Sequence, residues 1–112
     1  MAAPEVVFSA PVPNDTEVER NVRVRIQFSR DVDPRTIDGH VTVTYVPPAG
    51  GTAPPPPAFT TAYNDVAHAI EIRFAQPLER FQQVKVEITE GVVALDRQPV
   101  KPWTLIFTTG GT

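Results

Sequence analysis

Apolar and polar residues alternate strictly in segment after segment of this 112-residue chain, and this period of two constrains its fold more than any other feature. The clearest case is residues 22–28, where four large apolar side chains alternate with arginines and a glutamine. Successive side chains of a strand point to opposite faces, so this segment has one apolar and one polar face. The pattern predicts a strand with one buried face, and we expect it to be central in its sheet.

Two later segments, 70–74 and 84–89, repeat this two-sided design, and we expect them to be neighbours joined by the connection 76–83. The remaining alternating segments are 5–9, 40–46, 58–64 and 103–108. Seven short strands without any helix-period segment favour an all-β sandwich over a fold with alternating strands and helices. A closed barrel is the structural alternative.

Proline dominates the connections. Thirteen prolines disfavour long helices, because each one removes a backbone donor and fixes φ. Asp33 and Pro34 suit the cap and the first position of one short helical turn between two strands. Residues 47–57 contain six prolines, which predict an exposed, flexible loop of polyproline character. We expect this loop to act as a spacer and not as a ligand for aromatic grooves.

The composition is that of one ordinary globular domain over residues 1–112, with 1–4 and 110–112 as linker ends. A net charge of −3 with scattered cations gives no attraction to nucleic acid. The absence of cysteine excludes thiol catalysis and cysteine-ligated zinc. The chain opens without a charged region followed by an apolar run, so we expect no membrane insertion, and the signal of an exported protein would lie upstream.

Several segments match a known pattern in their order and spacing. They are 9–15, 24–34, 70–74 followed by Pro77 and Leu78, 86–92 with Asp96, and 107–109. Together they resemble the bacterial Ig-like domain family first noted in surface-layer proteins. The resemblance implies a seven-stranded antiparallel immunoglobulin-like β-sandwich, used as one of several modules in exported bacterial proteins and without family-wide catalytic residues.

Two loops depart from the family pattern. The family often has a glycine after the aspartate of the last loop, whereas this chain has Arg97 after Asp96. The proline-rich insertion at 47–57 is also longer than is usual. Both departures concern loop geometry and leave the predicted fold unchanged.

The best candidate for a metal site is the acidic group Asp31, Asp33 and Asp38, because calcium takes several carboxylate and carbonyl oxygens from one loop. Their spacing does not follow the EF-hand pattern. We therefore favour structural roles, in which Asp33 caps a turn and the other two shape bends. Calcium is the alternative, with Asp15 or Asp96 as further ligands, and we expect no other cofactor.

No motif for catalysis is present: the chain lacks a Gly-x-Ser-x-Gly motif, suitably paired carboxylates and a glycine-rich phosphate loop. We therefore predict no catalytic residues and no enzyme. His40 and His68 are expected at partly exposed loop edges and not as metal ligands. Trp103 is in phase with Leu105 and Phe107, which favours a buried core residue over a platform for sugars.

Three arginines belong to the polar faces of the predicted strands. Arg23, Arg25 and Arg73 are expected to form cross-strand pairs with carboxylates such as Glu71 and Glu87. Charged side chains on a strand also protect a sheet against aggregation.

Two classes of function follow. The first is a structural or interaction module that spaces or supports neighbouring domains of a secreted, periplasmic or cell-surface protein, with other surface proteins or polysaccharide as further partners. The second is a binding module for polysaccharide, calcium or copper. Residues 24–29 resemble a sequence segment of small periplasmic copper-binding proteins, but the N-terminal histidine on which those proteins depend is missing. In the first class the packing residues matter most, namely Val24, Ile26, Phe28, Ile72, Phe74, Val86, Trp103 and Phe107.

Overall fold

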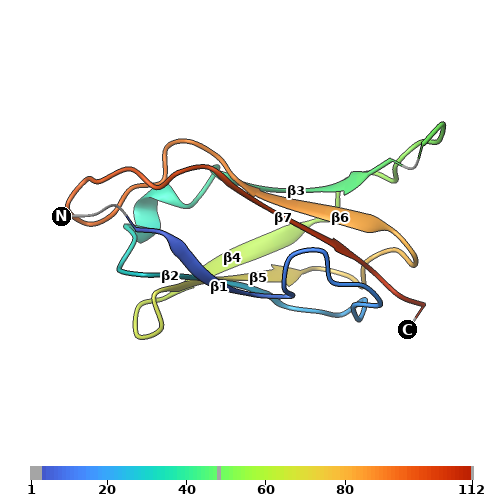
Figure 1. The fold of residues 1–112 in the computed structure, drawn as a ribbon, viewed down its shortest axis with the longest axis horizontal. Coiled ribbons are helices and arrows are strands. Elements are labelled where there is room, and N and C mark those ends of the chain that lie inside the picture. The colour runs from blue at the N-terminus through green and yellow to red at the C-terminus, as the bar shows by residue number, and fades with distance from the viewer. Residues whose placement is uncertain (1–3, 48, 112) are drawn as a thin grey trace.

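The computed structural model describes residues 4–47 and 49–111, and this part of the chain forms seven strands in two antiparallel sheets (Figure 1). The first sheet has the order β1 (Val6–Ala10), β2 (Val24–Phe28), β5 (Ala69–Phe74) and β4 (Phe59–Asn64). The second sheet has the order β3 (Val41–Val46), β6 (Gln83–Ile88) and β7 (Trp103–Thr108). The predicted all-β sandwich of seven antiparallel strands is confirmed.

The core lies between the two sheets. Val24, Ile26 and Phe28 of β2 are at most 1% exposed, and Val86 and Phe107 from the second sheet belong to the same buried cluster. Burying a large apolar side chain of this kind contributes roughly 1.5–3 kcal/mol to folding. β2 lies between β1 and β5, which confirms the prediction of a central strand.

One prediction of strand pairing is wrong. Segments 70–74 and 84–89 are not neighbours, because β5 pairs with β2 and β4, whereas β6 pairs with β3 and β7. The connection between them crosses from one sheet to the other, and Leu78 in this connection is fully buried. The N–H of Leu78 donates to the carbonyl oxygen of Arg20 at 2.8 Å, which anchors the crossing.

Two predicted core residues are buried only in part. Phe74 is the last residue of β5 and Trp103 is the first residue of β7. Both pack against the core cluster but lie at strand ends, where the rim of the sandwich meets solvent. Alternation assigns a side chain to the inner face of a sheet, but its depth depends on where the strand ends.

The predicted helical turn is present as a short 3-10 helix at Pro34–Thr36, capped by Asp33. The proline-rich loop is exposed along most of its length, and Pro48 lies outside the described residues. Its second half nevertheless packs on the domain, because Pro54 and Pro57 are half-buried while Pro55 and Pro56 are exposed. A polyproline II helix has three residues per turn, so Pro54 and Pro57 would lie on the same face of such a helix. This face packs on the protein.

The sandwich is elongated, with extents of 44 × 26 × 22 Å. The described chain begins towards one end of the long axis and finishes at the other end (Figure 1). Both Pro4 and Gly110 are buried, so the packed domain reaches nearly to both ends of the described chain. No helix in the described residues has the length and the apolar character needed to cross a bilayer.

Candidate functional site

A hydrogen-bonded group of polar side chains occupies one end of the sandwich. This Asp31 cluster consists of Asp31 after β2, Tyr63 in β4, and His68 just before β5. The Tyr63 hydroxyl donates to Oδ1 of Asp31 at 2.7 Å, and Nδ1 of His68 lies 2.7 Å from the same oxygen. The N–H of Val32 donates to the Tyr63 hydroxyl at 3.0 Å. The cluster therefore links the end of β2 to the β4–β5 hairpin.

The electrostatics of the Asp31 cluster follow from these contacts. Burial, and secondly the hydrogen bond to Asp31, raise the pKa of Tyr63 to about 12. The hydrogen bonds from Tyr63 and His68 hold the pKa of Asp31 below its usual value. The cluster thus combines a charged carboxylate with a neutral phenol at neutral pH, and each of its side chains is engaged in a bond within the group.

The other two predicted calcium ligands have different surroundings. Asp33 accepts a hydrogen bond from the backbone N–H of Arg35 and pairs with its guanidinium, each at 3.0 Å. The hydrogen bonds from Arg35 lower the pKa of Asp33. Asp38 is exposed and precedes Gly39, which has a φ of +80°.

The further candidate ligands are also engaged locally. Asp15 accepts from the N–H of Thr16 at 3.0 Å, and Asp96 forms an ion pair with Arg30. Within residues 4–47 and 49–111, no three histidine or carboxylate side chains gather into a set that could hold a metal ion. The structure brings Asp31 and Asp33 into two separate bonding arrangements, and the calcium site stays a prediction.

Both histidines lie at half-buried loop edges. Nδ1 of His40 is 2.8 Å from the carbonyl oxygen of Thr36, and a Cβ built on Gly91 would lie 2.5 Å from its Nε2. Gly91 has a φ of +119°, so this tight approach is available to glycine and strained for other residues.

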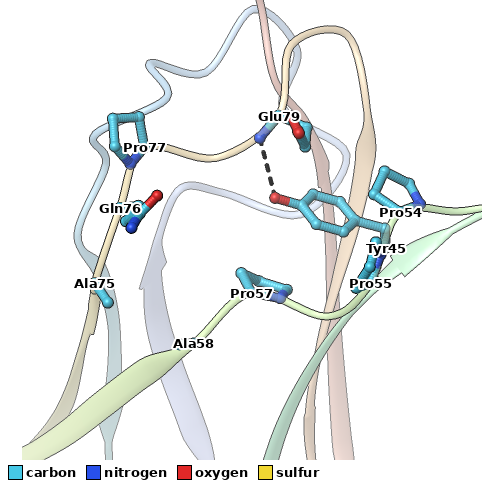
Figure 2. Close-up of a pocket in the computed structure, with 9 residues that line it drawn as sticks. All are labelled: Tyr45, Pro54, Pro55, Pro57, Ala58, Ala75, Gln76, Pro77 and Glu79. Atoms are coloured by element: carbon cyan, nitrogen blue, oxygen red, sulfur yellow. Dashed lines mark hydrogen bonds between the residues drawn. The ribbon is translucent and has the colours of Figure 1, made fainter.

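The opposite end of the sandwich holds a cleft of about 240 Å³ (Figure 2). Pro54, Pro55 and Pro57 form one side of it, and Gln76 and Pro77 form the other. This cleft was not predicted from the sequence, where its signal is the spacing of three between Pro54 and Pro57, the two half-buried prolines.

Tyr45 lies in this cleft but is only 7% exposed. Its hydroxyl accepts a hydrogen bond from the backbone N–H of Glu79 at 3.0 Å, as Figure 2 shows. The ring and its hydroxyl are therefore committed to packing, and the cleft presents no open aromatic face for a sugar.

The predicted cross-strand pairs of Arg23, Arg25 and Arg73 with carboxylates do not form among the described residues. Glu87 pairs instead with Lys85 on the same strand at 3.1 Å. Arg25 lies opposite Glu71 in the register, yet its buried Nε has no hydrogen-bond partner.

Two antiparallel sheets packed face to face in a domain of this length define an immunoglobulin-like β-sandwich. The chain belongs to the bacterial Ig-like domain family, whose profile matches residues 1–109. The resemblance inferred from the sequence is thereby confirmed. Comparison with curated protein sequences gives no match.

Solved structures share this fold at low sequence identity. PcoC, a methionine-rich copper resistance protein from Escherichia coli, is 19% identical with a TM-score of 0.77, and the match covers 96% of this chain and 99% of PcoC. The S-layer protein SbsC is 13% identical with a TM-score of 0.68, and the match covers 99% of this chain but 14% of SbsC. L,D-transpeptidase 1 from Mycobacterium tuberculosis is 14% identical with a TM-score of 0.59, and the match covers 96% of this chain and 39% of the enzyme.

Proposed function

We propose that this chain is a non-catalytic structural module that spaces or supports neighbouring domains of a larger exported or cell-surface bacterial protein. The course of the chain supports this proposal most directly, because the described chain begins towards one end of the 44 Å axis and finishes at the other (Figure 1). A polypeptide that enters at one end and leaves at the other keeps the domains on either side apart. A rigid sandwich sets that separation better than a flexible linker of the same length.

The comparisons support the same proposal. The matching region is 14% of the S-layer protein and 39% of the transpeptidase, so the fold occurs as one unit within larger chains. The polar side chains of the Asp31 cluster bond to one another, which suits a structural role. An active site would instead need polar groups that are free to meet a substrate.

An immunoblot tests the proposal. An antibody raised against this domain is used on cell, envelope and culture fractions of the source organism. We expect a band much larger than the 12.3 kDa of this chain, in the envelope or the medium. A band near 12.3 kDa in the cytoplasm would overturn the proposal.

Copper binding is a second candidate, favoured by the match that covers 99% of the copper resistance protein PcoC. Copper sites use sulfur and imidazole ligands, and this chain has one methionine, two histidines and no cysteine. Nδ1 of each histidine already lies within hydrogen-bond distance of an oxygen within the fold. Copper binding therefore ranks behind the structural role.

Thermal melting separates these candidates. A structural module should melt at the same temperature with added copper, with added calcium and with a chelator. A ligand that binds only the folded state raises the melting temperature, and its stabilisation grows with the logarithm of the ligand concentration above Kd. A rise with copper would support the second candidate, and a rise with calcium that is lost in Asp31→Asn would support the calcium site.

A further inference from the structure

Two arginines face each other where β2 begins and β5 ends. The register pairs Val24 with Ile72, and one further step places Arg23 opposite Arg73. Both side chains belong to the outward face and are exposed. Like charges directly opposite each other on neighbouring strands destabilise a sheet, so this pair is unfavourable for folding alone.

Neither guanidinium is neutralised within the described part of the chain. The described ion pairs involve other cations, namely Arg30, Arg35, His68 and Lys85. Glu71 lies opposite Arg25, two steps along the register and on the same face of the sheet, so the residue directly opposite Arg23 is Arg73 and not a carboxylate. This local excess of positive charge stands on a chain whose net charge is −3.

The pair borders a second cleft of about 240 Å³, which we call the arginine cleft. Besides the two arginines, the residues that line it are Asn21, Val22, Phe74, Ala75, Gln76 and Pro77, none of which is acidic. Guanidinium groups bind carboxylates through two parallel hydrogen bonds, and amide side chains suit hydroxyl groups. A flat apolar side chain such as proline offers contact to the C–H face of a sugar ring.

From this geometry we infer that the arginine cleft binds an acidic polysaccharide, with a sugar carboxylate held between Arg23 and Arg73. The neutral amides of Asn21 and Gln76 bond to hydroxyl groups of the same sugar or its neighbour. This binding activity goes beyond the proposed spacer role and does not depend on it, since a free-standing domain would present the same cleft.

Titration calorimetry with polygalacturonate tests the inference, with dextran as the uncharged polysaccharide and polyphosphate as the non-sugar polyanion. We expect the domain to bind polygalacturonate and not dextran, and to bind polyphosphate more weakly. Arg23→Gln and Arg73→Gln should each weaken binding about tenfold or more, because each removes a charged hydrogen-bond donor. Arg23→Lys should recover part of the affinity, because it restores charge without the planar fork.

Lys101→Gln is the matched control. Lys101 is also exposed and lies just before the start of β7. Thr109, just after the other end of β7, bonds to Glu79, which is two residues from Pro77 of the arginine cleft. Lys101 therefore lies at the end of the sandwich opposite the arginine cleft. We expect this variant to bind like the original chain. Circular dichroism of all variants verifies that the fold is intact.

Several results would overturn the inference. They are no binding of polygalacturonate, equal binding of dextran, tighter binding of polyphosphate, or an equal loss in the Lys101 variant, which would indicate diffuse attraction. Unchanged binding accompanied by aggregation of Arg23→Gln would assign the arginines to protection of the sheet and not to a ligand.

Discussion

Arg97 occupies a backbone conformation that favours glycine, with a φ of +73°. The left-handed region costs a residue with a Cβ about 1–2 kcal/mol, while glycine loses about 0.5–1 kcal/mol of additional chain freedom on folding. We therefore expect Arg97→Gly to stabilise the domain by roughly 0.5–1 kcal/mol, measured by urea unfolding.

Gln98→Gly is the control for this substitution. Gln98 is not among the residues with positive φ, so its replacement should lower the free energy of unfolding by roughly 0.5–1 kcal/mol. If Arg97→Gly destabilised the domain as much as the control, strain at position 97 would be refuted.

The ionisation of the Tyr63 phenol at high pH can be followed by absorbance. The Tyr45→Phe background leaves Tyr63 as the one tyrosine of the 112-residue sequence. We expect its phenolate to appear with a midpoint near pH 12, because burial and the bond to Asp31 raise the pKa of Tyr63 to about 12. Adding Asp31→Asn should lower the midpoint, but only in part, because burial is the larger cause.

The sign of the effect on stability follows from linkage. The folded state holds the Tyr63 proton more tightly than the unfolded state, so this stabilisation is complete below about pH 10 and is lost as the pH rises towards 12. Circular dichroism of the same samples marks the range in which the domain is folded. A midpoint near pH 10 in the folded domain would contradict the raised pKa.

At the scale of elements, the central strand β2 and the edge strand β1 provide a matched comparison. Phe28 of β2 is 1% exposed, whereas Phe8 of β1 is 50% exposed. Phe28→Ala should cost about 3–5 kcal/mol, because it removes buried contacts and leaves a cavity. Phe8→Ala should cost less than about 1 kcal/mol, since half of its side chain is already in solvent.

Chemical denaturation of both variants measures the difference between these elements. Equal losses of the free energy of unfolding would contradict the assignment of β2 to the centre of the core. A large loss at Phe8 alone would mean that the edge strand is covered in solution.

At the scale of the whole molecule, the opposed ends of the chain make a prediction about length. Two copies joined directly, residue 112 to residue 1, should form an extended rod, because each copy enters and leaves at opposite ends of its long axis (Figure 1). Small-angle scattering should give a maximum dimension of roughly twice the 44 Å length of one domain. A maximum dimension close to that of a single domain would show that the copies fold back on each other.

The sequence determined what depends on local periodicity. Alternation placed the seven strands to within about two residues, because the period of two is a property of each strand alone. The cap at Asp33 was likewise predictable, since its partners lie within two residues. The family could also be inferred from the sequence, because the resemblance rests on the order and spacing of segments along the chain.

Only the tertiary structure decided which distant segments meet. Inward-facing strands of both sheets carry the same pattern, so alternation could not assign β5 and β6 to different sheets. The Asp31 cluster joins residues more than thirty positions apart, and the arginine cleft depends on the register of β2 against β5. Such contacts depend on the connection at Leu78, which crosses between the sheets, and on the packing of the two sheets. Neither feature can be predicted from the local alternation of apolar and polar residues.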